Sequence, residues 1–195
     1  MKKQIILLLA LAFVSVSFVS LSSEVESQLK VDVTNSIIKW KGYKPTGSHN
    51  GTIALLNGQL KMRGKKIKEG FFTVDMQSLK DAGKSKRLEG HLKAKDFFEV
   101  EVFPTATFEI TSSENKDGKT YLSGKMTIKN ITKEIIIPAI VTNNDGVITL
   151  ITETFKIDRT EFNVKYKSKS FFNNLREKFI NDEFDLQVTI VANKE

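Results

Sequence analysis

The feature that most constrains the fold is a series of alternating apolar and polar segments joined by short turns. Four such segments cover residues 105–112, 120–129, 134–142 and 147–157. Asp-Gly occurs in two of the three connectors between them, at Asp117-Gly118 and Asp145-Gly146. This pair favours the tight turns of β-hairpins, and hairpin after hairpin predicts an antiparallel meander.

Alternation also marks the rest of the chain, at residues 30–44, 52–62, 67–76 and 184–192. Asn57-Gly58 interrupts the second of these segments and predicts a bulge or bend in a long strand. About eight strands with few prolines favour an all-β fold, a closed antiparallel barrel without exposed sheet edges. A barrel of this size is either filled by side chains or holds one small ligand. The fourteen Phe residues would give it an apolar interior.

Two stretches depart from the β pattern. Between residues 77 and 103, Leu88 and Leu92 are one helical turn apart, and Gly83 and Gly90 keep any helix short. Residues 88–108 therefore predict a lid-like connection at one barrel end that continues into a wall strand. Near the C-terminus, Ser170 followed by Phe171, Leu175 and Phe179 at four-residue spacing predicts a short helix that plugs an open end.

The N-terminus resembles a secretory signal peptide. Lys2 and Lys3 precede an apolar run over residues 5–19, and small residues follow at Ser20 and Ser22. The run is shorter than the roughly 20 apolar residues of a membrane-spanning helix, the alternative interpretation. We therefore expect a signal peptide at 1–22 and a single domain at 23–195, in a periplasmic or secreted protein. The chain has no cysteine, so core burial must stabilise it without disulfides.

The formal charge of +7 does not by itself indicate a nucleic-acid partner. The lysines are scattered, and most alternate with apolar residues or lie in turns, which is typical of a solvated outer face. The same Lys-rich and Glu-rich face, with few Tyr or Trp, argues against a barrel that faces lipid. The sequence is compatible with a homodimer as well as with a monomer.

The sequence offers little catalytic chemistry. It has two histidines far apart and no cysteine, so neither a metal site nor a cofactor is predicted. No nucleophile elbow, phosphate loop or dinucleotide motif occurs. His49, His91 and Arg159 are either ordinary surface residues or contacts for the polar head of an apolar ligand. An enzyme that uses them on a hydrophobic substrate is the alternative to a binding protein.

Several stretches, taken in order, resemble the YceI-like family of polyisoprenoid-binding, lipocalin-like periplasmic proteins. The matching stretches are 36–42 (SIIKWKG), 47–52 (GSHNGT), 71–79 (FFTVDMQSL), 90–92 (GHL), 96–98 (DFF), 103–108 (FPTATF), 124–132 (GKMTIKNIT), 157–160 (IDRT), Tyr166 and 168–172 (SKSFF). The sequence departs from the family pattern at Asn130 and Asn163, where we expect glycine. Asn tolerates the left-handed backbone better than most residues, so the fold is not in doubt.

The resemblance implies an eight-stranded antiparallel lipocalin-like barrel that binds, carries or sequesters a long polyisoprenoid or isoprenoid-quinone-like chain in a hydrophobic tunnel, without catalysis. A fatty acid or fatty amide in the same tunnel is an alternative ligand. The candidate ligand contacts are Trp40, His49, Phe72, His91, Phe97, Phe98, Phe108, Arg159, Tyr166, Phe171 and Phe172.

Overall fold

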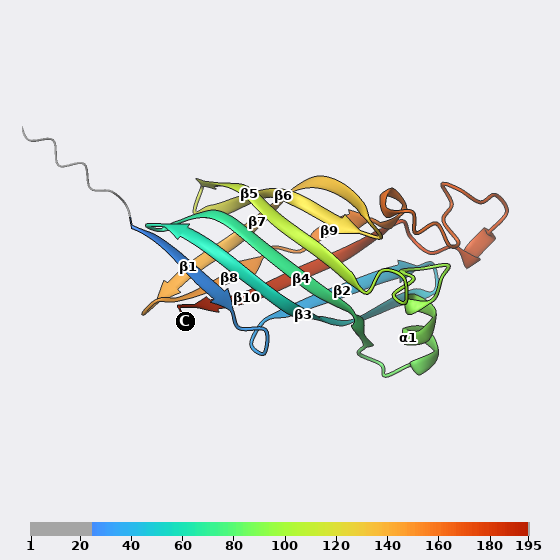
Figure 1. Cartoon of the computed structure of the whole chain (residues 1–195). Helices are drawn as coiled ribbons and strands as arrows, with labels where there is room; N and C mark the ends of the chain where they lie inside the picture. The colour runs from blue at the N-terminus through green and yellow to red at the C-terminus, as the bar shows by residue number, and fades with distance from the viewer. Residues whose placement is uncertain (1–24, 195) are drawn as a thin grey trace, which may run out of the picture.

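The computed structural model describes residues 25–194, which form one antiparallel sheet closed into a barrel (Figure 1). The expected signal peptide lies outside the described residues. The strands are β1 (Glu26–Val31), β2 (Ile37–Lys44), β3 (Gly47–Arg63), β4 (Lys66–Asp81), β5 (Thr105–Lys116), β6 (Lys119–Ile128), β7 (Ile131–Asn144), β8 (Val147–Thr152), β9 (Phe155–Asp158) and β10 (Glu183–Asn193).

The ring contains eight strand positions, as the sequence predicts. β10 closes it by pairing with β2 on one side and with β8 on the other. β1 and β2 share one position between β10 and β3, and β8 and β9 share another next to β10. The bulge or bend predicted from Asn57-Gly58 is present directly before this pair, because the pairing of β3 with β4 shifts register between Leu55 and Asn57.

The two barrel ends differ in their connections. The end that we call the hairpin end carries the tight turns β3–β4, β5–β6 and β7–β8, together with both termini of the described chain (Figure 1). The opposite end, the lid end, carries the connection between β4 and β5 and the long segment between β9 and β10. Within residues 25–194, every connection longer than eight residues therefore lies at the lid end.

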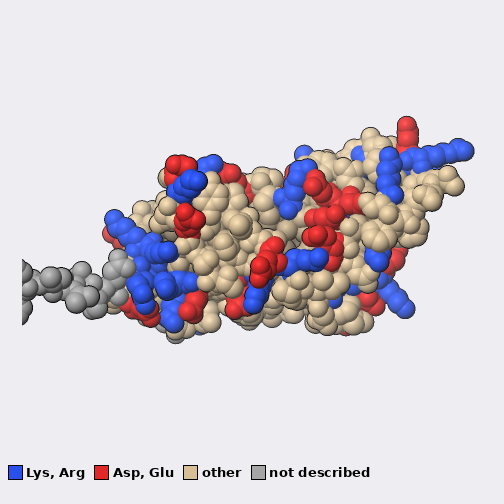
Figure 2. All heavy atoms as spheres, turned by 90° about the horizontal axis from the view of Figure 1, so that it is seen from above, with Lys and Arg blue, Asp and Glu red and all other residues tan. Residues whose placement is uncertain are grey.

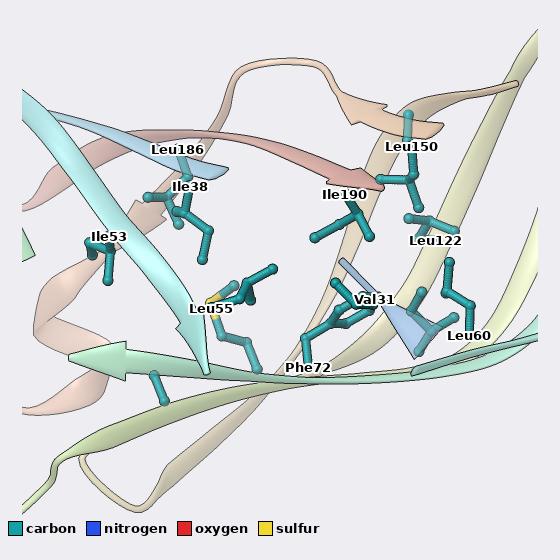
Figure 3. Packing of buried hydrophobic residues seen from close by; sticks show 14 of the residues in the cluster. Val31, Ile38, Ile53, Leu55, Leu60, Phe72, Leu122, Leu150, Leu186 and Ile190 are labelled. Carbon is teal, nitrogen blue, oxygen red and sulfur yellow. The ribbon is translucent and has the colours of Figure 1, made fainter. Parts of the chain in front are cut away.

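Strand alternation places the apolar residues inside. Along β10, Leu186 and Ile190 are buried, whereas Thr189 between them is only partly covered. Figure 3 shows side chains from several strands pointing toward one another, including Ile38, Leu55 and Phe72. Burial of this aliphatic and aromatic surface is the main force that holds a cysteine-free barrel closed.

The helices lie partly where expected. The lid connection contains the α-helix α1 (Lys86–Lys93), which begins after the cap Ser85. Near the C-terminus, however, the helical spacing gives only the 3-10 turn η2 (Arg176–Lys178). Asn174 and Arg176 have positive φ values of 65° and 50°, which an α-helix does not accommodate. Phe171 and Phe172 are about half exposed, so the prediction that they plug the barrel end is wrong.

The asparagines that replace the expected glycines have the backbone that glycine would favour. Asn130 has φ 59° and Asn163 has φ 60°, both in the left-handed region. Asn163 ends the 3-10 turn η1 (Arg159–Phe162), and its N–H donates to the carbonyls of Arg159 and Thr160. Among residues 25–194, no helix is long and apolar enough to cross a membrane.

Candidate functional site

The interior of the barrel contains an apolar cavity of about 110 Å³. Residues from β2 to β10 and from the lid connection line it: Ile38, Ile53, Leu55, Phe72, Val74, Met76, Phe98, Ala106, Thr107, Phe108, Ile110, Leu122, Met126, Ile128, Ile137, Leu150, Thr152, Phe155, Phe184, Leu186, Val188 and Ile190. Thr107 and Thr152 are the polar members, and the Thr152 hydroxyl already accepts the N–H of Val188. The cavity therefore suits an apolar guest.

Two phenylalanines form part of the wall of this cavity. Phe72 of β4 and Phe108 of β5 are cross-strand partners, and their rings stack with centroids 6.5 Å apart. Gly124 on β6 leaves room for the Phe108 ring, since a Cβ there would lie 2.7 Å from it. A side chain at position 124 would thus displace Phe108 as well as press on the Glu109 carbonyl.

A third phenylalanine closes the cavity from the lid. Phe98 follows α1 and packs edge-on against Phe184 of β10, with ring centroids 6.4 Å apart. Its neighbour Phe97 is buried, and the two rings are 5.1 Å apart. Phe98 is thus the lid residue that lines the cavity, and Phe97 lies behind it.

Behind Phe97 lies a second cluster, outside the cavity. The His91 ring of α1 packs edge-on against Tyr166 at 4.7 Å and against Phe97 at 5.8 Å. Arg159 also contacts this cluster, with its guanidinium carbon 5.6 Å from the Phe97 ring centroid. The cluster joins the lid to the segment between β9 and β10, and the ring contact between Phe97 and Phe98 connects it to the cavity.

Arg159 is a structural anchor. Its guanidinium is almost fully buried and donates to the carbonyls of Asn181, Val164 and Ile180, and to Asp182. Burial lowers the pKa of Arg159, and the carboxylates of Asp182 and Asp158 oppose that shift. Because these partners use its donors, Arg159 has little left to offer a ligand head group.

A buried carboxylate fixes the lid helix. Glu89 of α1 accepts the N–H of Asp81 at the end of β4 and an ammonium hydrogen of Lys86. These hydrogen bonds, with that to Lys86 the stronger influence, lower the pKa of Glu89. Asp81 in turn accepts the N–H of Ser85, the N-cap of α1. The helix is thereby attached to the barrel rim by polar groups.

The remaining candidate residues lie at the lid end but do not line the cavity. His49 of β3 is 44% exposed, with Nδ1 3.9 Å from Asp81 Oδ1. Trp40 of β2 donates its indole N–H to the Lys80 carbonyl. Of the sequence-predicted contacts, the structure brings Phe72, Phe98 and Phe108 together in the cavity, and His91, Phe97, Arg159 and Tyr166 together behind it. Phe171 and Phe172 lie apart on the surface.

Sequence reasoning missed most of the aliphatic lining. Leu186 and Val188 of β10 and Met126 and Ile128 of β6 alternate with polar residues and face inward. Their alternation with polar residues could have identified them as lining residues. The candidate contacts predicted from the sequence are instead aromatic and charged residues. Among the described residues, no group of three or more His, Asp or Glu side chains could hold a metal ion.

Comparison with known proteins gives consistent results. Residues 26–192 match the family model described as YceI-like domain. Among solved structures, BcnA of Burkholderia cenocepacia superposes with a TM-score of 0.69 at 22% identity, covering 84% of this chain and 99% of its own. A polyisoprenoid binding domain from Saccharophagus degradans, implicated in plant cell wall breakdown, gives 0.65 at 14% identity, covering 86% and 98%. These similarities show the fold. A search of curated proteins finds no match.

Proposed function

The chain belongs to the YceI-like family, and on that premise we propose that it binds a long apolar lipid chain inside its barrel and carries or sequesters it without catalysis. The observation that supports the proposal most directly is the cavity inside the barrel, whose lining is apolar apart from two threonines. The similar fold of a polyisoprenoid binding domain supports an isoprenoid chain as the ligand class. A fatty acyl chain is the alternative guest.

The driving force is the removal of hydrocarbon from water, about 0.8 kcal/mol for each buried CH₂ group. The cavity of about 110 Å³ is small for such a chain, since an engineered cavity of about 150 Å³ accepts one benzene. A long guest must therefore move side chains aside. The rings of Phe98, Phe155 and Phe184 belong to lid-end segments. We propose that these rings are the first to move aside when a guest enters.

The positions of the ionisable groups support the proposal that the protein carries a lipid rather than catalyses a reaction on it. Neither histidine lines the cavity, and each has its Nδ1 3.9 Å from a carboxylate, of Asp81 for His49 and of Asp96 for His91. Arg159 is occupied by backbone carbonyls. A guest in the cavity would meet hydrocarbon rather than acid or base groups.

The test is extraction of protein purified from its own host, followed by mass spectrometry of the extracted lipid and by uptake of an added polyprenol. Val188→Phe places a ring in the cavity and should abolish uptake. Val191→Phe is the matched control, because it lies on the outer side of the same strand β10. Absence of co-purified lipid together with equal uptake by the two variants would refute binding in the barrel.

A further inference from the structure

The segment between η1 and β10 forms a projection that the cavity does not use. Residues 163–181, which we call the basic loop, extend beyond the barrel at the lid end (Figure 1). Its base is fixed: Arg159 binds the carbonyls of Val164 and Ile180, and the N–H of Ile180 donates to the Lys167 carbonyl. Ser168 in this base is fully buried. The loop therefore presents its outer residues from a defined support.

Two adjacent aromatic rings lie on the exposed part of the loop. Phe171 is 49% exposed and Phe172 is 50% exposed, and neither lines the cavity. Their N–H groups both donate to the Ser168 carbonyl, which ties this part of the backbone to the buried base. Exposed adjacent phenylalanines on an anchored projection are the kind of apolar surface that marks an interaction site.

The basic loop is also strongly cationic. It contains Lys165, Lys167, Lys169, Arg176 and Lys178, with Glu177 as its single acidic residue. Two ammonium groups lie over the loop's phenylalanine rings, Lys165 at 4.6 Å from Phe171 and Lys169 at 3.6 Å from Phe179. Within residues 25–194, none of the five cations forms an ion pair with a carboxylate. Figure 2 shows Lys and Arg side chains projecting from this end.

Cations and half-exposed phenyl rings together fit one partner, an anionic lipid bilayer. Aromatic side chains insert at the level of the head groups, and clustered lysines are attracted to negatively charged lipids. We propose that the basic loop docks the protein on an anionic membrane surface, with Phe171 and Phe172 inserted and the lysines against the head groups. The loop contacts the lid through Tyr166 and His91, so docking brings the lid end to the bilayer. The proposal goes beyond ligand binding and needs no occupied cavity.

The hairpin end provides a contrast. It is also rich in basic residues, but Arg63 pairs with Glu26 at 2.6 Å and Lys61 lies 3.7 Å from Glu69. Carboxylates thus neutralise part of its charge, and no pair of exposed phenylalanines accompanies it among the described residues. Cations at this end serve as the control surface.

A local probe tests docking, because the chain has no cysteine of its own. Asn173→Cys, labelled with an environment-sensitive dye, reports on the basic loop, and Lys65→Cys with the same dye reports on the hairpin end. Vesicles of phosphatidylcholine, with and without phosphatidylglycerol, are titrated into the protein isolated from its host. We expect a blue shift at position 173 with the anionic vesicles only, weakening with salt, and none at position 65.

Substitutions then separate the contribution of the lysine charges to vesicle binding from that of the inserted phenylalanine rings. Lys165→Gln/Lys167→Gln/Lys169→Gln should raise the vesicle concentration for a half-maximal shift on the order of 100-fold, and Phe171→Ser/Phe172→Ser should raise it at least about tenfold. The matched controls Lys65→Gln/Lys66→Gln/Lys68→Gln and Phe71→Ser/Ile136→Ser, read with the dye at 173, should change it little. Polyprenol uptake should be unchanged in all four variants.

Three outcomes would overturn membrane docking. One is the absence of any shift at position 173 with anionic vesicles, and a second is an equal shift with neutral vesicles. The third is loss of binding in the lysine variant with full binding in the phenylalanine variant, which would mean that the charges alone are attracted to the vesicles and that no ring inserts. Because uptake is measured separately, failure of docking leaves the cavity proposal intact, and failure of uptake leaves docking intact.

Discussion

The two ends of the barrel use different means to reach the same closed sheet. At the hairpin end, Leu60, Ile67 and Ala192 are at most 1% exposed and do not line the cavity. The cavity extends from the middle of the barrel to the lid end, where polar anchors such as Arg159 and Glu89 hold the covering segments. Tight turns allow aliphatic residues to pack together, whereas the long connections cover the cavity with buried side chains such as Phe97 and Phe162 and with these polar anchors. The stability of the barrel thus concentrates at one end and its capacity for a guest at the other.

The largest loss of stability is expected from truncating a buried side chain at the hairpin end. Leu60→Ala should destabilise the protein by about 4 kcal/mol, because it removes a fully buried side chain from a filled region. Leu186→Ala, at the cavity wall, should cost only about 2 kcal/mol, since part of that side chain already faces free volume. Urea unfolding measures both values.

The same two variants distinguish effects on stability from effects on lipid uptake. Leu186→Ala enlarges the cavity and should raise polyprenol uptake, whereas Leu60→Ala should leave uptake unchanged wherever the protein stays folded. Equal losses of stability, or equal changes in uptake, would mean that the two ends do not differ in packing.

The next largest loss of stability is expected from replacing the buried Arg159. Arg159→Met should cost about 3 kcal/mol, because carbonyls of residues 164, 180 and 181 lose a charged donor inside the protein. The loss should appear first as faster hydrogen exchange in residues 163–181, while β3 and β4 stay protected near the hairpin end. Arg176→Met is the matched control on an exposed turn and should change stability by less than about 0.5 kcal/mol. Uniform loss of protection through the barrel would contradict the anchor role.

The sequence predicts the hairpin end better than the lid end, for a physical reason. Alternation and turn chemistry are local signals, so the strands, the bulge in β3 and the closed ring follow from them. Phe171, Leu175 and Phe179 carry an equally regular helical spacing, yet in the structure Phe171 is about half exposed and the segment buries little of its apolar surface. Without such burial, helical propensity alone does not hold a short helix, and the segment forms the basic loop instead.

The candidate site is predicted in the same uneven way. Phe72 and Phe108 lie on regular strands, so their inward direction could be read from the pattern. The position of Phe98 rather than Phe97 in the cavity depends on how the lid folds back over the barrel, which local spacing does not encode. The anchor role of Arg159 depends on carbonyls about twenty residues away, at positions 180 and 181, and no short-range signal marks them.

The smallest effect on stability should come from lowering the pH, and it should be confined to the lid. Glu89 has a lowered pKa in the folded protein, so it stabilises the lid above its ordinary value of 4.5, and that contribution is lost as the pH falls through the lowered value. The protection factor of the Asp81 amide, which donates to Glu89, should therefore fall below pH 4.5, while that of the Leu60 amide at the hairpin end changes little. Glu89→Gln should reduce protection at neutral pH and remove this pH dependence. Glu69→Gln, at an exposed pair with Lys61, should do neither. If Glu89→Gln kept the acid-dependent loss, another carboxylate would have to hold the lid, and Asp81, which accepts the N–H of Ser85, would be the next to test.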